Sequence, residues 1–299
     1  MTFAIELADA VSAQLNDAAG AWFQAEREKL RGGVSSSAFS VSLSKASRFA
    51  KDTAHLEAST ELIRAAQSVA PGTVLERWTL LEATRVALIL SLDGLDTEAG
   101  AQTIEDAFRY ADEGELCALY RSLALLPAPE RFRWRAAEGC RTNMRSVFEA
   151  NVLDTPYPST QFDEVAWRQA VIKCLFVEAP LWRLVGLDAR LDDELARMAL
   201  DLAEERTSAH RAVYPELWAC VGTHGGERGK ALLLAQLDDK AAQPAGRAAA
   251  AVALVRAGLA SELEPRLADE RDARVVDAAR AALAGATGQT VFGRFRDDD

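Results

Sequence analysis

The sequence predicts an all-α protein, and two observations support this fold class. Apolar residues recur in nearly every segment with the helical period of about 3.6, instead of the alternation typical of strands. Ala, Leu, Glu and Arg, which favour helices, are abundant, and glycine, proline and capping residues separate the segments. We therefore expect an irregular stack of helical hairpins, HEAT-like or α-superhelical, especially toward the C-terminus.

The N-terminal helices are predicted within residues 1–127 of a single all-α body that spans residues 1–299. Apolar spacing predicts a helix over residues 3–30 that ends at Gly32, because glycine is favoured just after a helix. The following residues 35–47 are rich in serine and predict a link between helices.

Capping residues predict where several later helices begin. Thr73 and Glu76 have the spacing of a capping box, in which each side chain accepts a hydrogen bond from the other residue's backbone N–H. Asp163 and Asp192 precede apolar helical patterns and are expected to cap them. Pro244 suits the first turn of a helix, where no backbone N–H is needed.

The rest of the chain divides by composition into three predicted segments. Residues 128–222 form a central polar and aromatic segment, interrupted at residues 151–162 by prolines that predict a loop. Residues 223–288 are Ala-rich and predict HEAT-like helices, and residues 289–299 predict a tail.

Composition and charge exclude several classes of protein. The 49% hydrophobic and 26% charged fractions are those of an ordinary folded protein, and no apolar run is long enough for a membrane span. The net charge of −11 argues against nucleic acid as a partner, because such binding draws on basic surface. The acidic, amphipathic start lacks the features of a secretory signal, so we expect a cytoplasmic protein.

No motif predicts a metal, a cofactor or a particular reaction. The three histidines lack the spacing of metal ligands, and the four cysteines are too far apart for a metal clamp or redox pair. The glycine-rich residues 222–230 differ from a phosphate-binding loop, because His224 and Ala231 replace required residues. We therefore predict no metal and no cofactor, and leave open whether the protein is an enzyme.

Charged and aromatic side chains concentrate in the central segment, where such groups line a ligand pocket or form ion-pair networks. On one predicted helix, Gln169 and Lys173 share a face, next to the more apolar face that carries Trp167. The candidate ligand-binding residues are Arg141, Asn143, Glu149, Tyr157, Trp167, Gln169, Lys173, Asp188, Arg190, Glu205, Arg206 and Trp218. The alternative is that these charges pair with one another as partly solvated salt bridges.

An ordered series of short motifs in this segment resembles the EboA-domain family. The series comprises Arg141-Thr142-Asn143, Val147-Phe148-Glu149-Ala150, Pro156-Tyr157-Pro158, Phe162, Trp167-Arg168-Gln169, Lys173, Phe176, Gly186-Leu187-Asp188-Ala189-Arg190, Glu205-Arg206 and Pro215-Glu216-Leu217-Trp218. The resemblance is strongest over residues 138–220. Arg168 stands where the family commonly has asparagine, and the family supplies no catalytic residues.

The resemblance implies a helical protein that serves a bacterial secondary-metabolite cluster, beside a prenyltransferase-like membrane protein, a hydrolase-like barrel and a dehydroquinate-synthase-like enzyme. Such clusters are associated with moving an aromatic pigment precursor outward, or with a small secreted metabolite. We expect an accessory protein that binds, and could transform, a polar, anionic or aromatic small-molecule intermediate in the central segment. The alternative is a non-catalytic HEAT-like scaffold that assembles the other enzymes of the cluster.

Overall fold

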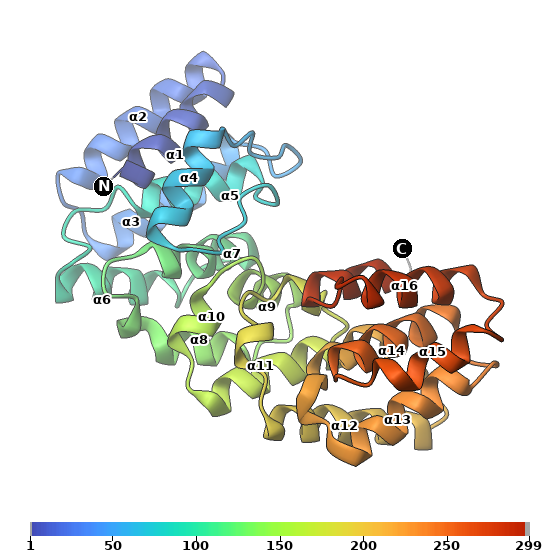
Figure 1. Ribbon diagram of the computed structural model, residues 1–299. Coiled ribbons are helices and arrows are strands. Elements are labelled where there is room, and N and C mark those ends of the chain that lie inside the picture. Colours follow the sequence, from blue (N-terminus) through green and yellow to red (C-terminus); the bar gives the residue numbers. More distant parts are fainter. Residues whose placement is uncertain (1, 297–299) are drawn as a thin grey trace. The chain divides into compact units, whose positions relative to one another are not determined.

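The computed structural model describes residues 2–296, which form helices joined by short connections (Figure 1). Within this range there is no strand, only an isolated bridge between His55 and Thr79. The prediction of an all-α fold is therefore confirmed. No helix among the described residues is both long and apolar enough to cross a bilayer.

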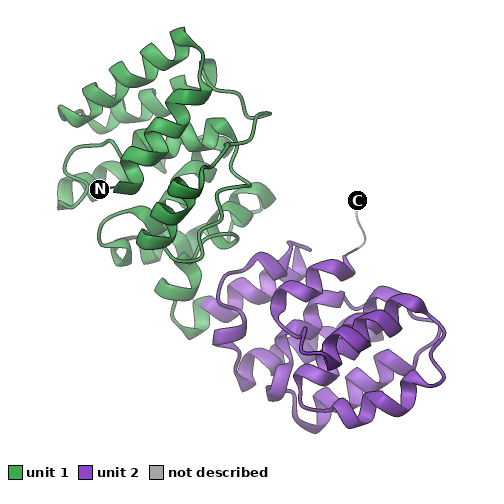
Figure 2. Cartoon of the chain, turned by 45° about the horizontal axis from the view of Figure 1, so that its top comes forward, with its two compact units in different colours: residues 1–166 green, residues 167–299 purple. Residues whose placement is uncertain are grey.

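The chain forms two compact units, Met1–Ala166 and Trp167–Asp299 (Figure 2). The α-helices of the first unit are α1 Thr2–Gln14, α2 Asp17–Arg31, α3 Ser36–Lys45, α4 Thr60–Val69, α5 Leu80–Ile89, α6 Glu98–Ala107, α7 Glu113–Ser122, α8 Arg133–Gly139, α9 Arg145–Val152 and α10 Tyr157–Gln161. Its 3₁₀ helices are η1 Ala46–Arg48, η2 Leu123–Leu125 and η3 Pro129–Phe132. Helix α11, Glu164–Phe176, begins in this unit and continues into the next.

The core of the first unit centres on α5, whose residues from Leu80 to Ile89 are nearly all buried. Helices α1, α2 and α7 pack against α5, so that it is surrounded by other helices. A helix buried on most sides needs a mainly apolar sequence, and α5 is apolar apart from Glu82, Thr84 and Arg85.

Predicted boundaries in this unit are wrong at three places. Residues 151–162, expected as a loop, contain the end of α9 and the short helix α10. At the other two places a new helix begins where none was predicted. The helix expected over residues 3–30 is broken after Gln14, because the Asn16 side chain accepts a hydrogen bond from the Ala19 N–H and starts α2. The residues expected as a serine-rich link form α3 instead, with Ser35 as its N-cap. In both cases a polar side chain caps a new helix.

The predicted capping box is also displaced. Thr73 hydrogen-bonds through its hydroxyl to the Ala70 carbonyl, which closes the turn after α4. The capping box is made six residues later by Thr79 and Glu82, and it opens α5. The other predicted caps are confirmed: Asp163 and Asp192 accept hydrogen bonds from the first turns of their helices.

The second unit contains α12 Asp193–Ser208, α13 Gly226–Asp238, α14 Pro244–Arg256, α15 Ala260–Leu267 and α16 Ala273–Leu283. Its 3₁₀ helices are η4 Leu181–Arg183, η5 Asp188–Arg190, η6 Pro215–Cys220, η7 Gly222–His224 and η8 Gln289–Phe295. Pro244 stands at the start of α14, as predicted. Residues 289–295, expected to belong to a tail, form η8, whereas residues 297–299 lie outside the described residues.

Helix α14 is the core of the second unit and is buried from Ala245 to Leu254. Helices α13, α15 and α16 and the short helices η6 and η8 all pack on it. Its surface is made largely of alanine, and small side chains let neighbouring helices approach closely. These neighbours hold η6 and η8 in place beside α14, where they form part of the pocket described next.

Candidate functional site

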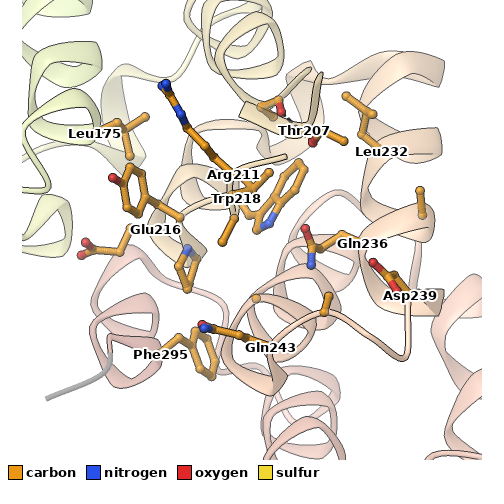
Figure 3. A pocket seen from close by; sticks show the side chains of 18 of the residues that line it. Leu175, Thr207, Arg211, Glu216, Trp218, Leu232, Gln236, Asp239, Gln243 and Phe295 are labelled. Atoms are coloured by element: carbon orange, nitrogen blue, oxygen red, sulfur yellow. Dashed lines mark hydrogen bonds between the residues drawn. The ribbon is translucent and has the colours of Figure 1, made fainter. Parts of the chain in front are cut away.

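A pocket of about 780 Å³ opens within the second unit, and its lining mixes apolar and polar side chains (Figure 3). The apolar part comes from α11 to α14, from η6 and η8, and from the segments after α11, before η6 and between α13 and α14. It consists of Leu175, Ala179, Ala203, Ala212, Val213, Pro215, Leu232, Ala235, Ala241, Ala242, Gly246 and Phe295. The polar and amphipathic part is formed by Glu178, Thr207, His210, Arg211, Tyr214, Glu216, Trp218, Gln236, Asp239, Gln243 and Arg296.

Helix η6 places Glu216 and Trp218 in the wall of this pocket. Pro215 is at the first position of η6, as the sequence predicts, although the helix is of the tighter 3₁₀ type. Because η6 packs on both α12 and α14, its side chains have little freedom to move. The backbone around these two lining residues is therefore held by the core of the unit.

Trp218 has an unusual hydrogen-bonding state. Its side chain is 1% exposed, yet its Nε1–H has no hydrogen-bond acceptor among the described residues. Buried tryptophan N–H groups usually find a partner, since leaving a buried donor unpaired is costly. Figure 3 shows the indole in the pocket, with its nitrogen-bearing end directed toward the side that Gln236 and Gln243 occupy.

The Glu216 carboxylate is buried and fully engaged by protein groups. One oxygen accepts a hydrogen bond of 3.0 Å from the Trp182 N–H, and the other forms an ion pair with Arg296. Burial raises the pKa of Glu216 above its usual value, and the contacts with Trp182 and Arg296 oppose this rise. The pair links η6 to the C-terminal segment that supplies Phe295.

The rim of the pocket is a turn between α12 and η6. His210 adopts a positive φ of 56°, which is uncommon for a residue with a side chain. The Tyr214 hydroxyl donates to Glu178, and burial, followed by this contact, raises the pKa of Tyr214. The Arg206 guanidinium lies 3.8 Å from the centre of the Tyr214 ring, and its Nε donates to the Ala212 carbonyl at 2.6 Å.

Of the residues predicted to bind a ligand, Trp218 lines the pocket. Arg206 holds the rim through Tyr214 and Ala212, and Glu205 is exposed on the same helix. The late candidates Arg206 and Trp218 therefore belong to the rim and the lining of the pocket. The candidates that precede Glu205 in the sequence do not line it.

Trp167 and Arg190 contact each other in the second unit but do not line the pocket. The Trp167 Nε1–H donates to the Arg190 carbonyl at 3.2 Å, and the Arg190 guanidinium lies 4.8 Å from the indole centre. Gln169 is exposed and Lys173 is half-buried on the same helix. Arg168, which stands where the family commonly has asparagine, forms a bidentate ion pair with Asp192, with N–O distances of 2.7 to 3.1 Å.

Asp188 attaches the C-terminal segment to the second unit. Its carboxylate accepts from the Gln289 N–H at 3.0 Å and pairs with Arg256 at 2.5 Å. In return, the Asp188 N–H donates to the Gln289 side chain at 3.1 Å. These contacts give Asp188 a structural role at the start of η8.

The predicted residues of the first unit lie at its surface or in its core. Arg141 is exposed and forms an ion pair with Glu138, and Asn143 is exposed in the turn before α9. Glu149 pairs with Arg145 one helical turn earlier, at 2.8 Å. Tyr157 is buried, donates to the Pro129 carbonyl at 2.7 Å, and has a pKa raised by burial.

Sequence reasoning missed most of the pocket. Leu232, Gln236, Gln243 and Phe295 come from segments read as Ala-rich helices and a tail, and no local pattern distinguishes them. Only the folded arrangement brings them together with Trp218. Among residues 2–296, no cluster of three His, Cys, Asp or Glu side chains is arranged to hold a metal ion.

Comparison with known proteins supports the resemblance found in the motifs. Neither a curated protein nor a solved structure matches the chain. A family model described as metabolite traffic protein EboA matches residues 4–222, which include η6 and its Trp218. Because this match covers well over half of the chain, the protein belongs to the EboA family of metabolite traffic proteins.

Proposed function

We propose that the protein binds a small organic intermediate of a secondary-metabolite pathway in the pocket of its second unit. Membership of the EboA family supports a role in a metabolite pathway. The observation that carries the proposal is the 780 Å³ pocket itself, which combines apolar walls with the buried indole of Trp218. Pockets that bind drug-sized molecules have volumes of about 300 to 1,000 Å³ and are mostly apolar, with a few polar groups.

The buried and half-buried titratable groups of the lining, Glu216 and Tyr214, support binding more than proton transfer, whereas His210 and Asp239 are exposed. A catalytic carboxylate needs an oxygen available to the substrate, whereas Glu216 uses one oxygen for the Trp182 N–H and the other for Arg296. Tyr214 already donates its hydroxyl to Glu178. We therefore favour a protein that holds and hands on its ligand over one that transforms it.

A pocket-filling substitution tests this proposal. Ala235 lines the pocket from α13 and is exposed, so Ala235→Trp places a large ring in the pocket without crowding the core. Ala231→Trp is a matched control, because Ala231 is exposed one turn earlier on the same helix and does not line the pocket. Both variants should fold with melting temperatures close to that of the wild type.

Each purified protein is incubated with an organic extract of the producing cells, and the compounds that it retains are identified by mass spectrometry. The wild type and Ala231→Trp should retain a shared compound that raises their melting temperature, because a ligand stabilises the folded state by mass action. Ala235→Trp should lose both effects and fail to restore metabolite production in a deletion strain. Full production with Ala235→Trp would overturn the pocket proposal and favour the scaffold.

A further inference from the structure

Glu216 is the buried charged side chain of the pocket wall, and it already has protein partners, as does the exposed Glu178. The carboxylate of Glu216 is paired with Arg296 and also accepts from the Trp182 N–H. The Glu178 carboxylate accepts from Tyr214. A buried charge on a ligand needs a counter-charge to replace its lost hydration. Because these carboxylates already pair with other protein groups, they do not favour a charged ligand over a neutral one.

The buried polar group of the wall that lacks a partner in the described part of the chain is uncharged, whereas the charged lining residues Arg211 and Asp239 are exposed. Trp218 Nε1–H is buried with no acceptor among the described residues. The amide of Gln236, on α13, also has no hydrogen bond within residues 2–296, although its side chain is only half exposed. An indole N–H can only donate, so it needs an oxygen or nitrogen acceptor.

The Gln236 amide lies close to the backbone of α14 because that helix has glycine at the point of approach. A Cβ atom at Gly246 would lie 3.2 Å from Gln236 Nε2 and 4.0 Å from the Val213 carbonyl oxygen. Glycine thus leaves room for the amide beside the pocket. Two uncharged hydrogen-bonding groups, from η6 and α13, therefore contribute to the same wall.

We propose that the ligand is an uncharged, largely apolar molecule whose carbonyl oxygen accepts the hydrogen bond from Trp218 Nε1. This inference rests on the proposed function, because it concerns the ligand of the same pocket. Trp218 is then the residue that selects for the oxygen, and Gln236 supplies a second neutral contact. The corresponding carboxylate binds more weakly, since its charge would be buried beside Trp218, whereas Arg211, a cation of the lining, is exposed.

Three probes that share one ring system test the proposal: naphthalene, 2-acetylnaphthalene and 2-naphthoate. Their affinities are measured by equilibrium dialysis at neutral pH. The ketone should bind the wild type roughly two- to tenfold more tightly than the hydrocarbon, the gain expected from one neutral hydrogen bond. The carboxylate should bind at least about tenfold more weakly than the ketone.

Trp218→Phe keeps an aromatic ring and removes the donor, so the preference for the ketone over naphthalene should fall to about one. Trp134→Phe is the control, because Trp134 is 66% exposed in the first unit and should leave all affinities unchanged. A second readout does not depend on the folding of Trp218→Phe. In ¹⁵N-tryptophan-labelled protein, which has six tryptophans, the ketone should shift one indole N–H signal downfield and naphthalene should not.

The outcomes separate the two proposals. If Ala235→Trp leaves the binding of all three probes unchanged, the pocket is not the binding site and the proposed function is refuted. If Ala235→Trp abolishes binding but 2-naphthoate binds most tightly, or Trp218→Phe retains the preference for the ketone, the pocket stands and the neutral-carbonyl proposal is overturned.

Discussion

Glu270 offers a quantitative test of how the second unit is held together. Its side chain is 5% exposed and lies between α15 and α16. It forms ion pairs with Lys240 at 2.7 Å and with buried Arg247, and accepts from the Asp272 N–H at 3.0 Å. Glu270→Gln removes the charge while keeping the shape of the side chain, and leaves Arg247 without its counter-ion.

The expected loss follows from the pKa of this carboxyl. Burial alone would raise the pKa of Glu270, but hydrogen bonds from Lys240, Asp272 and Arg247 outweigh burial and lower the pKa from 4.5 to about 2. A difference of this size between the unfolded and folded states corresponds to about 3 kcal/mol of stability at neutral pH. Glu270→Gln should therefore lower the free energy of unfolding by about 3 kcal/mol at pH 7.

The pH dependence has a definite sign. A lowered carboxyl pKa contributes stability above the unfolded value of 4.5, and this contribution is lost as the pH falls toward about 2. At pH 3 the unfolded chain already binds the proton, whereas the folded chain mostly does not. The difference between wild type and Glu270→Gln should then shrink to about 1.5 kcal/mol.

Urea denaturation followed by circular dichroism, at pH 7 and at pH 3, measures both differences. Glu264→Gln is the control, because Glu264 is exposed and has no ion pair among the described residues. This control should change the free energy of unfolding by less than about 0.5 kcal/mol. A Glu270→Gln protein as stable as the wild type at pH 7, or a difference that grows on acidification, would refute the reasoning.

Two residues of the first unit test whether the predicted ligand-binding series extends to it. Arg141→Met should change the free energy of unfolding by less than about 1 kcal/mol, because the ion pair of Arg141 with Glu138 is exposed. Metabolite production should stay intact, and its loss in a folded variant would place Arg141 in a binding site. Tyr157→Phe should cost about 1 kcal/mol by removing the hydrogen bond to the Pro129 carbonyl, without affecting ligand retention. Urea denaturation and the extract assay measure both, and loss of the retained compound by Tyr157→Phe would contradict a purely structural role.

Helix boundaries could be predicted where the capping information is local. Asp163 and Asp192 cap their helices because each side chain reaches backbone N–H groups three residues ahead. The capping box could not be assigned in this way, since Thr73 and Thr79 are both followed three residues later by glutamate. A long-range contact distinguishes the two: the Val74 N–H donates to the carbonyl of Asp154, which is distant in the sequence, and the helix begins only at Leu80.

The pocket was predictable only in part, for a related reason. Trp218 could be selected because it is a large aromatic residue in a polar segment. Gln236 and Phe295 could not, because each belongs to a segment whose composition is unremarkable, and their role depends on which helices pack on α14. Asp188 shows the opposite case. It is a charged residue of the motif series and was predicted to bind a ligand, but it does not line the pocket and instead forms hydrogen bonds to Gln289 and pairs with Arg256.

The wall formed by Phe295 and Arg296 has a consequence for biosynthesis. A ribosome makes the chain from the N-terminus, so η6 and α13 emerge well before Arg296 is added. Until then Glu216 lacks its counter-ion, and a carboxyl without one resists burial. The nascent second unit therefore cannot complete this pocket before residue 296 has left the ribosomal tunnel.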